Sequence, residues 1–303
     1  MRYRPFARTG MAVSAISLAL DGADDDMAAG DWRDLVHGAF EEGVNAFEII
    51  HPSPALLIGF AEGAAAVRRQ LIFVGLRIDA DADPRDLQER VDDVATKSGL
   101  KTLNVLCLNA GDAISGPGPS PAMLGAMRHM KDVGLADRLA IAGEGAAIEE
   151  PVNSGVFDAL ITPFNLLSGW RERNLIRTAL ERQLCVIGAE PCPLELTELV
   201  DDAVVATKPG WFKRAAPLAG VGTYAFLKKT PGWTIEQLCL GYALTEPALA
   251  TVQVRPVSRE HLTTLAAAAE RDLPAAVSAQ IEMARFSAER EAGAERRSER
   301  RTA

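Results

Sequence analysis

Three side chains that could take part in proton transfer lie close together in the segment 48–53. The segment reads Glu48-Ile49-Ile50-His51-Pro52-Ser53. It therefore holds a carboxylate, an imidazole and a hydroxyl within six residues. An imidazole titrates near neutral pH, which makes His51 a candidate general acid. The hydroxyl of Ser53 is a far weaker acid than a phenol of pKa about 10, so it is not expected to deliver a proton. A single His before a Pro is more often an ordinary loop residue, and both interpretations of His51 stay open.

The elements around this segment predict a barrel. Short apolar runs alternate with segments that carry apolar residues at helical spacing, a pattern typical of parallel strands covered on both faces. The expected strands are Val13–Ala19, Asn45–Ile49, Leu71–Arg77, Leu103–Leu108, Leu139–Ala142, Ala159–Ile161, Leu184–Gly188 and Ala250–Val254. The expected helices are Trp32–Glu42, Asp83–Ser98, Pro121–Val133, Arg171–Arg182 and Ile235–Leu244, with starts at Asp83-Pro84-Arg85 and Thr234. Eight strands that mostly lead into helices favour a TIM (β/α)8 barrel. An open doubly wound sheet is the competitor, but no Gly-rich dinucleotide fingerprint follows the first strand.

Composition limits the class of function. The chain has 303 residues, of which 48% are hydrophobic, and a net charge of −9, which disfavours nucleic acid as a partner. We predict one barrel domain over residues 1–282 and a charged tail over residues 283–303. In the tail, arginines (Arg290, Arg296, Arg297, Arg300, Arg301) alternate with glutamates, which is typical of a solvated helix or a frayed end. The N-terminal segment has no apolar signal region and no apolar run reaches membrane-spanning length, so a cytoplasmic protein without a membrane span is expected.

Cysteine and histidine spacing gives no indication of a metal site. The four cysteines form no close CxxC pair, and buried thiols are expected of them. The four histidines are scattered along the chain (His37, His51, His129, His261), so no zinc ligand set is predicted.

The segment 42–53 resembles the first catalytic motif of the aldo-keto reductases. That family has a Gly, an aromatic residue, an Asp, and a proton-donating Tyr five residues after the Asp; here Gly43, Phe47, Glu48 and Ser53 take these places. The opening MRYRPFARTGMAVSAISLAL is similar to the family's N-terminal hairpin and first barrel strand. Further similar stretches follow in order, at Phe73–Arg77, Leu103–Asn109, Gly134–Gly143, Phe157–Leu167, Leu184–Leu194 and Trp233–Leu262. The resemblance implies a TIM barrel with an N-terminal β-hairpin.

The resemblance also implies that the catalytic tetrad is degenerate. In the family a Tyr donates the proton, a Lys paired with the Asp lowers the pKa of that Tyr, and a His orients the carbonyl. The four matching positions here are Glu48, Ser53, Arg77 and Asn109. Glu48 and Arg77 could still form an ion pair at the mouth of the barrel, and Asn109 could still donate to a carbonyl.

The positions that bind NADP in the family differ as well. The family's Ser-Asn pair, Gln and stacking Tyr match Ala142, Gly143, Ile161 and Ala189. The Gly and Arg of its pyrophosphate segment match Arg255 and Val257. The remaining candidates for contact with a cofactor are Asn165, Glu190, Arg255 and Arg259.

Two classes of function follow from this reading. The first is an accessory, structural or regulatory subunit that binds another protein, with no cofactor expected and with contact regions at Gly111–Pro121, Trp211, Phe212 and the charged tail. The alternative is an enzyme of altered chemistry. It either keeps NADP(H) and uses His51 or water as the acid, or it binds a small molecule between polar strand ends (Glu48, Arg77, Asn109, Glu144, Glu190, Arg255). A weaker third hypothesis is a sensor for an anion, held by Arg77 and Arg255.

Overall fold

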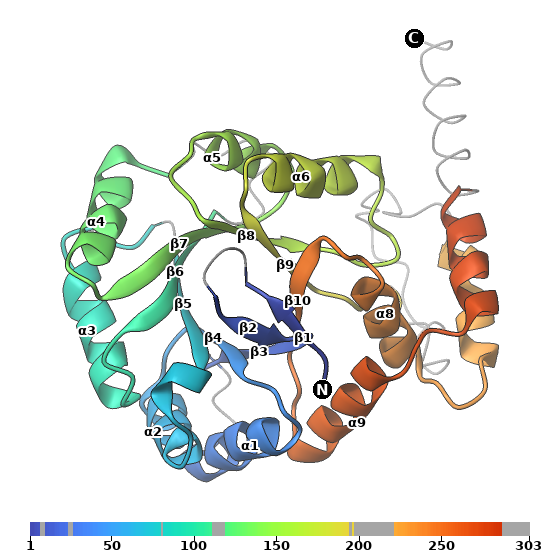
Figure 1. Cartoon of the computed structure of the whole chain (residues 1–303), viewed down its shortest axis with the longest axis horizontal. Helices are drawn as coiled ribbons and strands as arrows, with labels where there is room; N and C mark the ends of the chain where they lie inside the picture. Colours follow the sequence, from blue (N-terminus) through green and yellow to red (C-terminus); the bar gives the residue numbers. More distant parts are fainter. Residues whose placement is uncertain are drawn as a thin grey trace, which may run out of the picture.

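Eight parallel strands close into a barrel in the order β10-β3-β4-β5-β6-β7-β8-β9 (Figure 1). This computed structural model describes residues 1–6, 10–23, 27–79, 81–110, 119–193, 196 and 221–286. The barrel strands are β3 (Ile16–Asp21), β4 (Ala46–Ile50), β5 (Phe73–Asp79), β6 (Leu103–Asn109), β7 (Ala136–Ala142), β8 (Ala159–Pro163), β9 (Cys185–Ala189) and β10 (Leu249–Val254). The predicted TIM barrel is confirmed.

Helices form a ring around the barrel (Figure 1). They are α1 (Ala29–Glu41), α2 (Pro54–Ala64), α3 (Leu87–Lys97), α4 (Pro121–Asp132), α5 (Glu149–Asn153), α6 (Trp170–Glu181), α8 (Ile235–Leu244) and α9 (Arg259–Glu270). Shorter 3-10 segments occupy Arg69–Leu71, Gly145–Ile148 and Val221–Lys229. None of the helices in the described part of the chain combines the length and the hydropathy that a bilayer crossing requires.

Strand alternation divides the core into two apolar clusters. Side chains such as Leu18, Ile49 and Leu76 face outward and pack against the helices. Their neighbours along the strands face inward and fill the barrel, including Val105, Cys107, Ala140, Ala159, Ile161, Cys185 and Ile187. Both faces of each strand are therefore covered, which explains why most strands read as continuous apolar runs.

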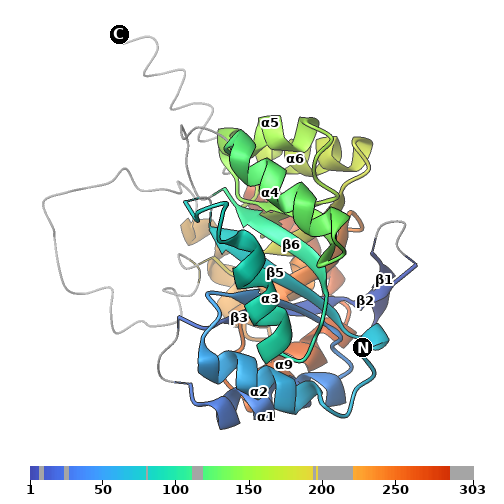
Figure 2. The same ribbon diagram turned by 90° about the vertical axis from the view of Figure 1, so that its left-hand side faces the viewer.

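A two-stranded hairpin closes the amino-terminal end of the barrel. β1 (Tyr3–Pro5) and β2 (Ala12–Ser14) pair antiparallel and lie at one end of the molecule (Figure 2), as the sequence predicted. Phe6 and Val13 belong to the inner cluster, and the ring of Phe6 lies 4.4 Å from that of Phe73, centroid to centroid. The hairpin is the floor of the barrel, and the mouth is the opposite end, where the strands finish.

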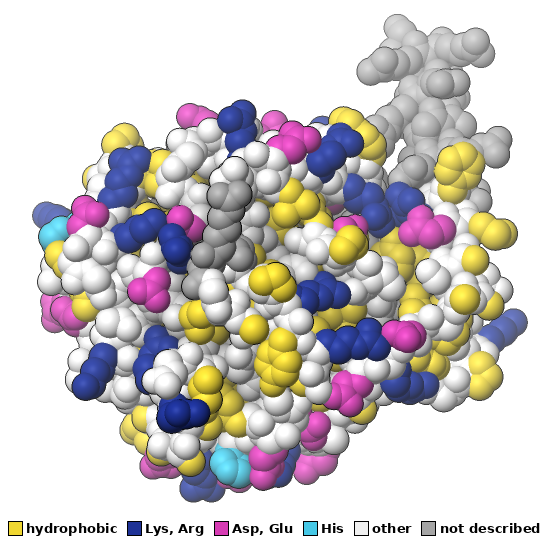
Figure 3. Space-filling model, in the orientation of Figure 1, with side chains coloured by type: hydrophobic (Ala, Val, Ile, Leu, Met, Phe, Trp, Pro, Cys, Tyr) yellow, Lys and Arg dark blue, Asp and Glu magenta, His cyan; other side chains and the backbone are white. Residues whose placement is uncertain are grey.

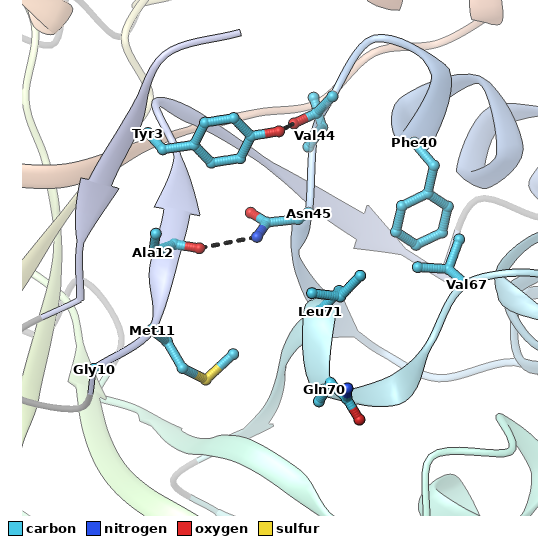
Figure 4. A pocket seen from close by; sticks show the side chains of 11 residues that line it. Tyr3, Gly10, Met11, Ala12, Phe40, Val44, Asn45, Val67, Gln70 and Leu71 are labelled. Carbon is cyan, nitrogen blue, oxygen red and sulfur yellow. Dashed lines mark hydrogen bonds between the residues drawn. The ribbon is translucent and has the colours of Figure 1, made fainter.

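The hairpin also borders a shallow groove of about 520 Å³. The side chains of Tyr3, Met11, Phe40 and Leu71 line it (Figure 4). On this face of the molecule, Lys and Arg side chains are interspersed with Asp and Glu (Figure 3). The groove lies at the amino-terminal end of the strands, whereas chemistry in TIM barrels is placed at the carboxyl end.

Several element boundaries differ from prediction because local polar contacts decide them. The expected strand Val13–Ala19 is two strands, since the chain leaves the hairpin at Ser14 and enters the barrel at Ile16. Asp83 was predicted to start a helix, but its carboxylate accepts from the backbone N–H of Arg85 and closes a turn, and α3 begins at Leu87. Thr234 does cap α8, in a reciprocal pair with Gln237. Helices α2 and α9 were not predicted as separate elements.

Parts of the predicted contact regions cannot be placed. Several of them lie outside the described residues: 111–118 of the Gly111–Pro121 segment, Trp211, Phe212 and residues 287–303 of the tail. Residues 275–286 are helical and bury Val277, Ile281 and Ala284. The division at residue 282 stays a prediction.

Removing the aromatic floor should destabilise the barrel. We expect Phe6→Ala to lower the free energy of unfolding by about 3–5 kcal/mol, because Phe6 is 1% exposed and its ring fills the space inside the strands. Urea unfolding followed by tryptophan fluorescence measures the change. Tyr3→Phe in the same hairpin is the control and should cost about 1 kcal/mol or less, since it removes only the exposed bond to the Gly43 carbonyl. Equal losses in the two variants would contradict the floor assignment.

Candidate functional site at the barrel mouth

A buried ion pair lies at the centre of the mouth. Glu48 on β4 is 3% exposed. Arg77 on β5 donates two hydrogen bonds to its carboxylate, from Nε to Oε1 at 3.1 Å and from Nη2 to Oε2 at 2.6 Å. Register explains the meeting, because β4 and β5 are neighbours and both side chains face inward. The ion pair expected from the sequence is present.

Gln253 on β10 completes this pair. Its Nε2 donates to Glu48 Oε2 over 2.6 Å, and its Oε1 lies 3.5 Å from Arg77 Nη2. Burial acts to lower the pKa of Arg77, but the charge of Glu48, its hydrogen bond and the nearby Cys107 and Glu190 together raise the net pKa above its ordinary value. The guanidinium is therefore a permanent cation with its charge already balanced. Sequence analysis missed Gln253, although a polar residue at an inward position of the apolar run Leu249–Val254 was a usable signal.

A second polar cluster surrounds His51 at the rim. The backbone of His51 has φ of 44°, a left-handed conformation that is uncommon outside glycine. Its Nδ1 lies 2.9 Å from Oδ1 of Asp21, and its Nε2 lies 3.7 Å from Oδ2 of Asp79. Arg255 approaches the other oxygen of Asp21 at 3.6 Å, and Asn109 Nδ2 lies 3.4 Å from Asp79 Oδ1. The imidazole thus lies between two carboxylates, which the sequence analysis had not included in the site.

Asp21 carries the clearest electrostatic signature of this cluster. Burial acts to raise its pKa, but hydrogen bonds from His51 and the Ala23 N–H, with the charges of His51 and Arg255, lower the pKa overall. The carboxylate is therefore held in its charged form. Its position at the last residue of β3 was the available sequence signal, because carboxyl ends of barrel strands converge on one face.

Other predicted site residues have structural partners. Ser53 is the N-cap of α2, and its hydroxyl accepts from the Leu56 N–H. Asn165 accepts from the Leu167 N–H and donates to the Glu190 carbonyl, which holds the turn after β8 against the end of β9. Arg259 on α9 is paired with Glu41 on α1. These three side chains serve the fold in the positions where they are found.

A cavity of about 180 Å³ opens beside the central pair. Arg77, Gln253 and Arg255 line one part of it and Glu190 and Glu236 another. The remaining lining side chains are mostly apolar: Ala19, Ala189, Pro191, Cys192, Leu240, Val254 and Leu265. Glu144, which the sequence analysis grouped with the mouth, lines a separate groove of about 400 Å³ beside α5 and α6.

The positions matched to the family's cofactor ligands offer few polar side-chain atoms. Ala142 and Ile161 point into the inner apolar cluster, and Ala189 packs against it. Gly143 donates its backbone N–H to the Ile161 carbonyl, which joins the two strand ends. Among the described residues, no group of three or more His, Cys, Asp or Glu side chains is arranged to hold a metal ion.

All three tyrosines of the chain are described, and their hydroxyls are bonded away from the mouth cavity. Tyr3 donates to the Gly43 carbonyl at the floor, and Tyr224 donates to the Leu166 carbonyl. Tyr242 on α8 donates to Glu282 and accepts from Arg173, and burial raises its pKa to about 12.

The architecture matches solved structures of an aldo-keto reductase, AKR11C1 from Bacillus halodurans. The apo form gives a TM-score of 0.69 at 15% sequence identity, over 94% of this chain and 96% of that chain. The holo form gives 0.71 at 16% identity, with the same coverage. The chain has the aldo-keto reductase fold. No protein-family model and no curated protein matches the sequence. At such low identity the likeness establishes the fold and leaves the activity to be argued from the site.

Breaking the Glu48–Arg77 ion pair should lower the stability of the protein. We expect Glu48→Gln to lower the free energy of unfolding by about 3–5 kcal/mol, because it leaves the guanidinium of Arg77 buried without a counter-charge. The double variant Glu48→Gln/Arg77→Met should recover part of this loss, since it also removes the buried cation. Urea unfolding of wild type, Glu48→Gln, Arg77→Met and the double variant measures the coupling free energy between the two side chains. Additive losses would mean that the pair is not coupled.

Unfolding at acidic pH should show whether the charged carboxylate of Asp21 stabilises the folded protein. A carboxyl whose folded-state pKa is depressed stabilises the protein above its unfolded pKa, about 3.9, and this contribution is lost as pH falls through the folded pKa. We expect wild type to be more stable than Asp21→Asn at pH 7 and the difference to shrink below about pH 4. Unfolding free energies across this range measure it, with Asp92→Asn on the exposed face of α3 as the control. If the difference in unfolding free energy between wild type and Asp21→Asn stayed the same at every pH, the assignment of a charged Asp21 would be refuted.

Proposed function

We propose that this protein is a barrel of the aldo-keto reductase fold that acts as an accessory, structural or regulatory binding subunit rather than as a carbonyl reductase. The observation that carries the proposal is the placement of the three tyrosine hydroxyls, all bonded to partners away from the mouth cavity. Reduction of a carbonyl needs a proton for the developing alkoxide, and the family resemblance assigns that proton to a tyrosine.

The groups at the centre of the mouth are poor substitutes for a phenol. Arg77 is a cation whose raised pKa opposes proton release, and its Nε and Nη2 donate to Glu48 and Gln253. Ser53 uses its hydroxyl to cap α2 and is an aliphatic alcohol. These contacts favour a structural role for the Glu48–Arg77 ion pair, which satisfies buried charges, over a role in proton transfer.

The fit of NADP(H) to the mouth is also poor. The cavity of about 180 Å³ is smaller than the roughly 300–1,000 Å³ of usual small-molecule sites. Glu190 and Glu236 line it and would repel phosphates, while Arg255 is engaged by Asp21. Alanine, glycine and isoleucine stand where the resemblance places polar and stacking contacts. Four lost contacts at about 1 kcal/mol each would weaken binding roughly a thousandfold.

One contact favours the alternative, an NADP(H)-dependent oxidoreductase with an altered site. The hydrogen bond between His51 and Asp21 orients an imidazole at the rim of the mouth, as a general acid would require. Under this alternative NADP(H) would supply the hydride, and Arg255 and Glu190, which line the mouth cavity, would be candidates to contact it. His51 is half exposed, and its second nitrogen faces Asp79.

Cofactor binding separates the two functions. We expect titration calorimetry to detect no NADPH or NADP⁺ binding at millimolar concentration, and no carbonyl-dependent NADPH oxidation to occur. Micromolar binding would refute the proposal. In that case, loss of turnover in His51→Asn with unchanged cofactor affinity would establish the alternative.

The accessory role has its own test. Native purification of the protein from its source should yield a partner protein in fixed stoichiometry. If the partner contacts a surface outside the mouth, it should still co-purify with the Glu48→Gln/Arg77→Met variant. A chain that elutes alone under gentle conditions, at native abundance, would contradict the accessory role while leaving the cofactor result intact.

A further inference from the structure

Two hydroxyl groups inside the barrel lack a hydrogen-bond partner. Ser17 on β3 is 4% exposed and Thr251 on β10 is 1% exposed. Among the described residues, no group forms a hydrogen bond with Ser17 Oγ or with Thr251 Oγ1. Most buried hydroxyls in proteins are bonded, because an unpaired one bears the full cost of its removal from water. These two oxygens therefore need a partner other than the described part of the chain.

Both hydroxyl side chains line one internal cavity of about 20 Å³. Closure of the barrel brings them there, since β10 pairs with β3 and Gln253 lies opposite Ser17 in the register. Thr251 and Gln253 are two residues apart on β10, so both side chains face inward. Glu48 and Gln253 supply the other polar side chains of the wall. Every residue that lines the cavity is buried, so the cavity lies within the protein.

The rest of the cavity wall offers no polar side chain. Its other side chains are hydrocarbon: Ala46, Phe47, Phe73, Val105, Ile161 and Ile187. None of the four cysteines, all of which are described, lines this cavity. Three of them are buried elsewhere in the core, and Cys192 is half-buried at the mouth, so the expectation of buried thiols is wrong for Cys192. A cavity lined only by apolar groups stays dry, and the two hydroxyls set this one apart.

The size and charge of the cavity select its ligand. A cavity needs roughly 10–15 Å³ to hold one water molecule, and a water needs two to four polar partners. About 20 Å³ therefore admits one water and no ligand of several heavy atoms. A cation is disfavoured, because the charge of Glu48 is already balanced by the buried guanidinium of Arg77. A water both donates and accepts, as does each of the two hydroxyls.

We propose that one water molecule binds in this cavity and bridges the hydroxyls of Ser17 and Thr251 as a structural ligand of the barrel. Glu48 and Gln253, in the same wall, are the polar side chains toward which its remaining hydrogen-bonding capacity is directed. The water extends the polar network of the Glu48–Arg77 ion pair deeper into the barrel. The inference stands independently of the proposed function, since it needs neither NADP(H) nor a partner protein.

Two measurements on the full-length protein locate the water. A high-resolution crystal structure should show a density peak within about 3 Å of both Ser17 Oγ and Thr251 Oγ1. In solution, magnetic relaxation dispersion of water oxygen counts long-lived internal waters and does not report hydroxyl protons. We expect the variant Ser17→Ala/Thr251→Val to hold one such water fewer than wild type.

A double-mutant cycle tests whether the hydroxyls share the water. Ser17→Ala and Thr251→Val should each lower the urea midpoint, because each leaves the water with fewer partners. The double variant should lose less than the sum of the two, since the remaining unpaired groups are then removed together. Ser98→Ala is the matched control. It removes a buried hydroxyl that donates to the Val94 carbonyl on α3, so its loss should add to that of Thr251→Val.

Gly75 allows the cavity to be filled without a clash. An alanine Cβ at this position would lie 3.5 Å from the Val105 carbonyl oxygen and 3.7 Å from Glu48 Cγ, which are ordinary contacts. Alanine in place of glycine in a strand is normally stabilising. Because the methyl group would compete with the water for the same space, we expect Gly75→Ala to lower the urea midpoint and to remove one long-lived water. Circular dichroism checks that each variant folds.

Any of three results would overturn the proposal. The first is a crystal structure in which both hydroxyls are bonded to protein groups and no density lies between them. The second is a higher urea midpoint in folded Ser17→Ala and Thr251→Val, as expected for the removal of unpaired hydroxyls from a dry cavity. The third is a higher midpoint in Gly75→Ala with an unchanged number of long-lived waters.

Discussion

Closure of the barrel between β10 and β3 is the constraint on which the rest of the structure depends. Val252 pairs with Ile16 and Val254 with Leu18, so strands more than 230 residues apart in sequence become neighbours. Once the sheet is closed, alternate side chains of all eight strands must share one small interior. Small and branched residues such as Ala140, Ala159 and Val105 fill most of it, and Phe6 closes the floor. The hydroxyls of Ser17 and Thr251 are buried inside the barrel, and the charged inward side chains Glu48 and Arg77 lie toward the opposite end.

At that end the protein satisfies its charges internally. Glu48 receives three donated hydrogen bonds, two from Arg77 on the neighbouring strand β5 and one from Gln253 on β10, which closure brings to it. The rim repeats the pattern, with His51 and Arg255 on Asp21. Glu48, Arg77, Asp21 and Arg255 already have partners, and these partners would have to be displaced before the four groups could bind a charged cofactor. This is the physical basis for preferring a binding or assembly role for the barrel.

The mouth is nevertheless not inert. The left-handed backbone at His51 and at Glu190, with φ of 44° and 49°, carries a strain that persists only where surrounding contacts impose it. Both residues lie just beyond strand ends, at the rim. Cys192 lies close by, on the cavity wall formed by the segment after β9 and by Glu236 and Leu240 of α8.

Local sequence determined the elements and much of their order. Apolar runs marked all eight barrel strands, and Thr234 marked the start of α8, because strand burial and helix capping depend on neighbouring residues. The pairing of Glu48 with Arg77 was also accessible, since both end adjacent strands of a recognisable barrel. Tertiary structure alone decided that Gln253 completes the pair and that Asp21 and Asp79 flank His51. Those contacts join segments 28 to 205 residues apart, and their distances follow from barrel closure, which no local pattern encodes.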